Sequence, residues 1–308
     1  SSQLNISQQQ KLVKTAFDLG KTGIFYENED LIKDEDKEGL LKIGFTQSFE
    51  FPTNYIAQNK LNKQAITVSQ SELTLAQKEM TRNVRSAYFS LWFIVEKQKL
   101  LHQQDSLFSD FENAASLRYS TGETNRLEFI SAQAKHKEIQ LALQSANSDV
   151  LIAQQEIMKL LNITNPILPV SEPMQKLQVP ISLIVDQQGT YSSPSGIHPY
   201  LNFYQQKISL ADYQQRVEVN KLLPEFAVRY FNQNWYGKEP GYYGYSLGVG
   251  IPIFFWAQKG KIQATKIEQQ IAQKNFENAT LEFNSSYNQT VQELSKQQSL
   301  LQYYETMG

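Results

Sequence analysis

Few residues of this chain have the types and the spacing that chemistry requires. Its histidines are His102, His136 and His198, and it contains no cysteine. No two histidines have the H-x-x-x-H spacing that places two metal ligands on one face of a helix. Gly248 and Gly250 stand in an alternating, strand-like stretch and lack the third glycine of a phosphate-binding loop. We therefore expect no enzyme activity, no cofactor and no metal site.

Charge and hydropathy argue against nucleic acid as a partner and against a transmembrane helix. The 308 residues carry a net charge of −2, so the chain lacks the basic surface that binds phosphate backbones. No apolar run in the sequence reaches the roughly 18 residues of a membrane-spanning helix. A transmembrane β-strand needs only about 9–11 residues of alternating hydrophobicity, so membrane strands stay open as an interpretation.

Two stretches of the chain repeat one arrangement, in which an alternating strand ends at a proline and a long run without glycine or proline follows soon after. Pro52 closes the first strand and Pro252 closes the second, and the same Ala-Gln pair stands five residues after each proline. This self-similarity predicts an internal repeat. We expect a first repeat over residues 1–164, a Pro-rich linker over 165–199 and a second repeat over 200–308.

Each repeat is predicted to hold a helix, two strands and then a long helix, which makes the fold mainly α with a small β part. The predicted strands lie at about 22–28, 40–50, 225–235 and 242–253. A long helical hairpin is predicted over about 54–163, with its turn at Gly122 and Thr124 as the N-cap of the returning arm. Its apolar residues recur at steps of three and four, which is typical of a coiled-coil-like seam. A single long helix is predicted over 257–307.

The alternation gives the predicted strands one apolar side. On that side we place Leu41, Ile43, Phe45, Leu247, Val249 and Ile251. Aromatic residues also gather near the strand ends, including Phe25, Tyr26, Tyr242 and Tyr243, as in the interfacial belt of a membrane barrel. Four strands leave two bare edges, which a bilayer does not tolerate, so further copies of the chain would have to close the sheet. A soluble sheet that packs its apolar side on helices is an equally open interpretation of the strands alone.

Three stretches together resemble the TolC-type outer-membrane efflux proteins. They are the doubled corner SFEFPTNYIAQ and GVGIPIFFWAQ, the passage HPYLNFYQQKISLADYQQRVEVNKLLPEFAV, and the turn LRYSTGETNRLEFISAQ. The resemblance covers nearly the whole chain. It implies that three chains form a 12-stranded transmembrane β-barrel in the outer membrane of a Gram-negative bacterium, with helical hairpins forming an α-barrel in the periplasm.

The resemblance also implies a role and a set of partners. The role is that of a duct in a tripartite efflux system, through which heavy-metal cations or small toxic compounds leave the periplasm. The full-length protein is expected to be a homotrimer that contacts outer-membrane lipid, a periplasmic adaptor protein and an inner-membrane pump. No nucleic acid is expected.

The hairpin tip is where the resemblance places functional residues. Gly122 matches the turn glycine of the family, and Glu128 falls where its members often carry an acidic residue at the tunnel entrance. Arg118 and Arg126 flank this position and complete the expected adaptor-docking tip. A helix-terminating glycine among solvated charges is the plainer interpretation of the same residues.

The chain departs from the family pattern at both ends. The lipidated N-terminal cysteine and the returning helix of the second repeat are missing, so we expect the chain to be truncated at both ends. The alternative hypothesis is a periplasmic structural or adaptor protein, with a long coiled-coil hairpin on a soluble β domain. Two symmetric strand pairs, each leading directly into a long helix, favour the duct.

Overall fold

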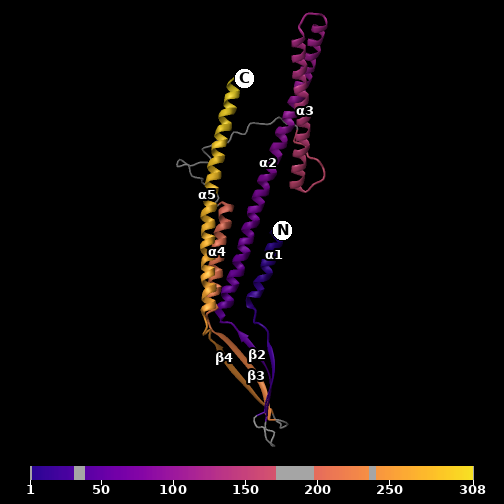
Figure 1. Cartoon of the computed structure of the whole chain (residues 1–308). Helices are drawn as coiled ribbons and strands as arrows, with labels where there is room; N and C mark the ends of the chain where they lie inside the picture. Colours follow the sequence, from indigo (N-terminus) through magenta and orange to yellow (C-terminus); the bar gives the residue numbers. More distant parts are fainter. Residues whose placement is uncertain (1, 31–38, 171–197, 236–240, 308) are drawn as a thin grey trace. The chain divides into compact units, whose positions relative to one another are not determined.

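A computed structural model describes residues 2–30, 39–170, 198–235 and 241–307 (Figure 1). Residues 31–38, residues 236–240 and most of the predicted linker therefore lie outside the described residues. The chain divides into two compact units, one made of Ser1–Leu75 with Pro180–Gly308 and the other of Ala76–Val179. Helix α2, Pro52–Ser120, contributes to both units.

The first unit contains a four-stranded antiparallel sheet in the order β1-β2-β3-β4 (Figure 1). Its strands are β1, Gly23–Asp30, β2, Gly39–Phe49, β3, Glu225–Trp235, and β4, Tyr242–Gly250. The central pairing joins β2 to β3 and so brings together two segments that are far apart in the sequence. The sheet confirms the four predicted strands, although β4 ends three residues before its predicted end at 253.

Helices continue from the strands of the first unit. They are α1, Ser2–Leu12, the short 3₁₀ helix η1, Val13–Phe17, the first part of α2, α4, Pro199–Asn220, and α5, Trp256–Met307. Pro199 occupies the first turn of α4, where its missing N–H costs no hydrogen bond. Helix α4 packs along α5, with Ala211 and Ala279 buried. On its other side Gln64 Nε2 of α2 donates to the backbone oxygen of Gln206 at 3.2 Å.

The two proline corners differ although their sequences match. Helix α2 begins at Pro52 itself, whereas α5 begins at Trp256, four residues after Pro252. Proline is favoured at the first helical position because its φ is already helical. The segment from Ile251 to Phe255 instead forms no helix or strand, and the rings of Phe254 and Trp256 contact each other with centroids 5.0 Å apart. The two proline corners are therefore more alike in sequence than in backbone conformation.

The second unit is a helical hairpin made of α2 and α3, Arg126–Leu161. Its core contains Leu91, which is fully buried, and Ile157, which is 2% exposed, together with Ala87, Val150 and Ala153. These residues stand at the apolar steps of three and four in the sequence, so the periodicity found the helix faces that meet. Ala76 and Met80, which have the same spacing earlier in α2, are exposed.

The end of each hairpin arm has a defined cap. Gly122 has φ +75° in the turn, a conformation that side chains with a Cβ rarely adopt. Asn125 caps α3 by accepting a hydrogen bond from the Glu128 backbone N–H at 2.9 Å, so the prediction of Thr124 as the cap was wrong by one residue. Asn162 ends α3 in the left-handed conformation, with φ 52°.

In the part of the chain that the structure describes, no helix combines the length and the hydropathy needed to cross a membrane.

Candidate functional site

One face of the sheet gathers most of its apolar side chains, and we call it the apolar face. Cross-strand register places Phe45, Tyr230 and Tyr245 in one row of it, because directly paired residues of neighbouring strands share a face. Its apolar members are Ile24, Tyr26, Leu41, Ile43, Phe45, Phe49, Phe226, Val228, Tyr230, Tyr243, Tyr245, Leu247 and Val249. The register also places on it the uncharged Asn28, Gln47, Asn232 and Asn234 and, where β1 ends beside Gly39, the acidic Asp30.

The apolar face contains the residues that the sequence placed towards lipid. Leu41, Ile43, Phe45, Leu247 and Val249 all lie on it, while Ile251 follows the end of β4. Leu247 is 73% exposed and Ile43 is 55% exposed. Most monomeric soluble proteins do not expose a contiguous apolar surface of this kind, so the face requires a cover that the single chain does not provide.

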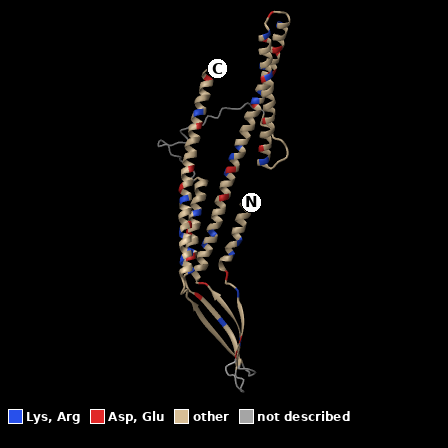
Figure 2. Ribbon diagram, in the orientation of Figure 1, with Lys and Arg blue, Asp and Glu red and all other residues tan. Residues whose placement is uncertain are grey.

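The opposite face of the sheet, which we call the polar face, carries the ion pairs. Figure 2 shows that charged residues are spaced along the helices and are few on the sheet. Lys42 Nζ lies 3.2 Å from Glu29 Oε1 and Arg229 Nη2 lies 2.5 Å from Glu27 Oε1. Glu225, the first residue of β3, lies on the same face. Both ion pairs of the sheet therefore lie on the face opposite to its largest group of apolar side chains.

An arginine stacked on a phenylalanine is the most elaborate contact of the polar face. The guanidinium carbon of Arg229 lies 4.2 Å from the centre of the Phe25 ring, which is the geometry of a cation–π contact. Phe25 therefore lies on the polar face, as does Tyr242, whereas Tyr26 and Tyr243 lie on the apolar face. Tyr242 and Tyr243 are exposed at the start of β4, as the sequence predicts, while Tyr26 is exposed in the middle of β1.

Glycines make room for the aromatic rings of the polar face. Gly44 of β2 pairs with Phe25 on one side and with Phe231 on the other, and Phe231 also pairs with Gly244. A methyl group on Gly44 would stand 2.3 Å from the backbone oxygen of Tyr230, and one on Gly244 would stand 2.6 Å from the Phe231 ring. Both glycines are therefore required by the close approach of neighbouring atoms.

The hairpin tip brings two of its predicted residues together. Arg118 Nη1 lies 2.9 Å from Glu128 Oε1, across the turn that contains Gly122. The hydroxyl of Thr124 donates a hydrogen bond to the other carboxylate oxygen of Glu128. Arg126 is exposed at the first position of α3. Behind the turn, the rings of Tyr119 and Phe129 stack with centroids 5.7 Å apart.

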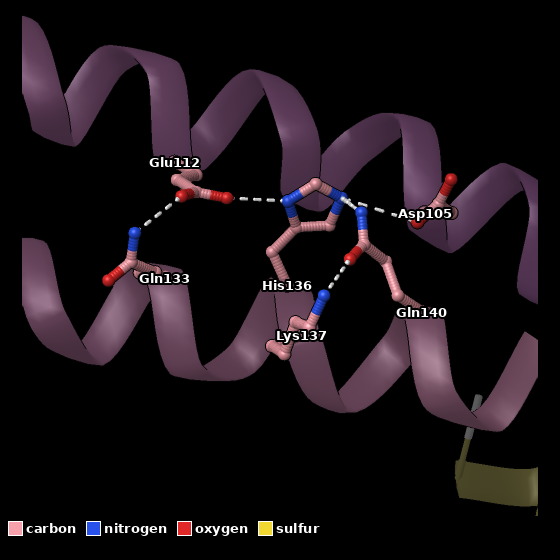
Figure 3. Close-up of polar contacts among 6 residues, drawn as sticks. All are labelled: Asp105, Glu112, Gln133, His136, Lys137 and Gln140. Carbon is pink, nitrogen blue, oxygen red and sulfur yellow. Dashed lines mark hydrogen bonds and ion pairs between the residues drawn. The ribbon is translucent and has the colours of Figure 1, made fainter.

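A histidine between two carboxylates joins the arms of the hairpin (Figure 3). His136 of α3 is 9% exposed, and its Nδ1 lies 2.6 Å from Glu112 Oε2 of α2. Its Nε2 lies 3.2 Å from Asp105 Oδ1, also of α2, and 3.2 Å from the side-chain nitrogen of Gln140. Gln133 Nε2 donates to the second carboxylate oxygen of Glu112 at 3.2 Å. We call these residues the histidine clip.

The histidine clip favours the charged form of its closest carboxylate. The hydrogen bond from His136 is the main cause that lowers the pKa of Glu112 below its ordinary value, and burial opposes it. The clip is thus a polar link between two helices.

Sequence reasoning weighed His136 only as a metal ligand and missed its partners. The signal was the distance from the turn, because His136 stands 14 residues after Gly122 and residue 108 stands 14 residues before it. Asp105 and Glu112 bracket that level, one helical heptad apart on the same face of α2. The antiparallel hairpin therefore places the ring between them.

The other histidines have separate surroundings. His102 is exposed on α2, and His198 caps α4, where its Nδ1 accepts a hydrogen bond from the Tyr200 backbone N–H at 3.2 Å. Within the described ranges, no three histidine and acidic side chains are grouped so as to hold a metal ion.

Comparison with known proteins gives matches at the level of structure. No family model matches the sequence, and no curated protein matches it either. The outer-membrane channel OprN superposes on 97% of this chain and 71% of its own, with a TM-score of 0.75 and 12% identity. CusC, described as forming a transmembrane channel, covers 99% of this chain and 73% of its own, with a TM-score of 0.72 and 13% identity.

A third neighbour has a named source. The CmeC outer membrane channel of Campylobacter jejuni covers 99% of this chain and 71% of its own, with a TM-score of 0.67 and 14% identity. Identities this low establish the arrangement of elements and leave the activity to be argued from the residues. With its four-stranded sheet and long helices, the chain has the fold of the TolC-type outer-membrane channels.

Proposed function

We propose that the chain is the outer-membrane channel component of a tripartite efflux system in a Gram-negative bacterium. In this role it passes substrates from the periplasm to the outside and performs no chemistry on them. Its partners are two further copies of itself, a periplasmic adaptor protein and an inner-membrane pump. Small toxic compounds or heavy-metal cations are the substrate classes to test.

The separation of charge on the sheet is the observation that carries the proposal. One face of the four paired strands is mostly apolar and widely exposed, while the other holds two ion pairs. Such a sheet suits lipid on one side and water on the other. Backbone groups at the edges β1 and β4 must find partners in a bilayer, and four strands do not close alone. Several copies arranged in a ring would satisfy both edges.

The length of the helices supports a duct that continues beyond the membrane. Helix α2 has 69 residues and α5 has 52, and each follows a strand of the sheet within a few residues. At 1.5 Å per residue these helices are about 100 Å and about 80 Å long. A soluble β domain does not need helices of this length. The structures with the same fold are outer-membrane channels, which favours this role over the periplasmic adaptor.

The hairpin tip is the surface that we propose for the adaptor. It combines the turn at Gly122, the ion pair between Arg118 and Glu128, and the exposed Arg126. Charged, accessible side chains at a rigid helical end can dock a partner by electrostatic complementarity. The residues Pro52 and Pro252 serve a different purpose, since they mark the change from strand to helix.

Fractionation of cells that produce the protein tests the proposal. We expect it in the outer membrane as an oligomer that resists heating in detergent, and we expect steps of conductance when it is added to planar bilayers. Recovery as a protein extractable from membranes by alkaline carbonate, without conductance, would reject the channel and support the adaptor.

A further inference from the structure

The Arg229–Glu27 ion pair of the polar face spans three strands. Arg229 stands on β3 and Glu27 on β1, so the arginine reaches across β2. Gly44 is the β2 residue that pairs with Phe25, and it presents no side chain to obstruct the arginine. The Phe25 ring then lies under the guanidinium, 4.2 Å from its carbon. Three strands thus contribute to placing one positive charge at a fixed position on the face.

The cation of this ion pair is more accessible than the lysine of the neighbouring pair. Arg229 is 40% exposed beside Glu27 at 39%, whereas Lys42 is 21% exposed beside Glu29 at 49%. A solute that moves along the polar face would meet the guanidinium and the Glu27 carboxylate directly. The guanidinium keeps its charge at any physiological pH, so its electrostatic effect does not change with pH.

The acidic charges of the face depend on Arg229 for their balance. In the described strands the polar face carries Glu27, Glu29 and Glu225 against Lys42 and Arg229. Loss of the arginine would leave three carboxylates with one lysine. The face would then attract cations and repel anions much more strongly than it does with the arginine in place.

We propose that Arg229 sets the charge selectivity of the duct where the sheet lines it, by offsetting Glu27 and holding the polar face close to electrical balance. The inference rests on the proposed channel function and adds the residue that determines which ions pass. A balanced face suits substrates of either sign, whereas the same face without Arg229 would select cations.

Reversal potentials across a KCl gradient in planar bilayers test this inference. Arg229→Gln keeps a polar side chain of similar reach and removes the charge, and we expect the potassium-to-chloride permeability ratio to rise about fivefold, the effect of one unit charge about 4 Å from an ion in water. Glu27→Gln should shift the ratio in the opposite direction. The double variant should return close to the original ratio, because it removes one charge of each sign.

Two controls separate charge from damage to the sheet. Arg229→Lys keeps the charge and loses the planar stacking group, so its selectivity should stay near that of the unaltered protein. Raising the salt from about 0.1 M to about 1 M shortens the Debye length from about 10 Å to about 3 Å and should reduce the effect of Arg229→Gln. A defect in folding would not depend on salt in this way.

The outcomes distinguish a failure of the selectivity role of Arg229 from a failure of the proposed channel function. If Arg229→Gln and Glu27→Gln both conduct with the selectivity of the unaltered protein, the role of Arg229 is overturned and the channel function is left intact. An unaltered protein that does not conduct would overturn the channel function, and the inference with it. A shift with Arg229→Lys as large as that with Arg229→Gln would show that stacking, and not charge, controls passage.

Discussion

The hairpin and the sheet differ in how far their apolar residues are buried. The hairpin buries its seam between its own arms, where Leu91 is fully buried and Ile157 is 2% exposed. The sheet leaves its apolar face uncovered, with Leu247 73% exposed. Burial of one such side chain is worth about 1.5–3 kcal/mol, so the hairpin is stabilised from within while the sheet depends on what surrounds it.

The two regions also place their charged groups differently. In the hairpin, the ring of His136 lies between carboxylates of α2, so it links the two arms. In the sheet, Arg229 and Glu27 stay on an open face that remains partly exposed to water. The polar groups of the hairpin therefore link elements of the fold, whereas those of the sheet stay accessible to solvent.

The largest expected effect separates the two faces of the sheet. Leu247→Lys places a charge on the apolar face, where an arginine or lysine at the membrane midplane costs about 2–4 kcal/mol. The matched control is Gly248→Lys, which places the same charge on the polar face. An added Cβ there would lie 3.6 Å from Ala227 Cβ, which is an ordinary contact. We expect outer-membrane abundance to collapse for Leu247→Lys only. Equal abundance of the two variants would show that the apolar face does not contact lipid.

A smaller loss of stability is expected when the turn glycine of the hairpin is replaced. Gly122→Val forces a β-branched residue into φ +75° and should cost the hairpin about 1–2 kcal/mol. Gly260→Ala, in the interior of α5 with no neighbouring atom within 4 Å of the added Cβ, should instead stabilise its helix by about 0.5–1 kcal/mol. Hydrogen exchange localised to each helix measures both changes. Similar destabilisation by the two substitutions would mean that the backbone at Gly122 is unstrained.

The histidine clip predicts that the hairpin responds to acid. Because the pKa of Glu112 is lowered in the fold, its contribution is present above the ordinary value of 4.5 and is lost as pH falls through the folded value. We expect local opening of α3 to increase in that range, measured by hydrogen exchange corrected for its intrinsic pH dependence. His136→Gln removes the main cause of the shift, so its pH dependence should be weaker. An unchanged profile in this variant would exclude the clip as the origin.

The smallest effect on stability is expected at the tip, where function should change more than folding. Glu128→Lys breaks an exposed ion pair with Arg118, and such pairs are worth about 0–1 kcal/mol. Glu138→Lys makes the same charge change within α3 at a carboxylate paired with Lys135. We expect reduced export by cells with Glu128→Lys, normal export with Glu138→Lys, and similar channel abundance in both. Full export by both variants would remove Glu128 from adaptor docking.

Much of the fold could be predicted from patterns within short segments of the sequence. Alternation located the strands, the absence of glycine and proline located the long helices, and the parity of Leu41 and Leu247 assigned both correctly to one face of the sheet. The errors were also local. The helix cap is Asn125 and not the predicted Thr124, and β4 ends at Gly250 and not at residue 253. Neighbouring residues of similar type can each form such a boundary, so its exact position is hard to predict.

The candidate sites were less predictable because they combine residues from distant segments. Nothing near Arg229 in the sequence indicates that its partner is Glu27, on a strand of the other repeat. The histidine clip was closer to prediction, since counting from Gly122 aligns His136 with the helical turn between Asp105 and Glu112.

The sequence by itself determined the elements, their order and the sidedness of each strand, since periodicity of two or of three to four fixes which side chains share a face. Only the tertiary structure decided that β2 pairs with β3 and that the charged members of β1 and β3 meet over Gly44. It also showed that the apolar face stays open while the hairpin seam closes. The physical reason is that pairing register and helix contact depend on the whole chain, whereas periodicity is a property of each segment alone.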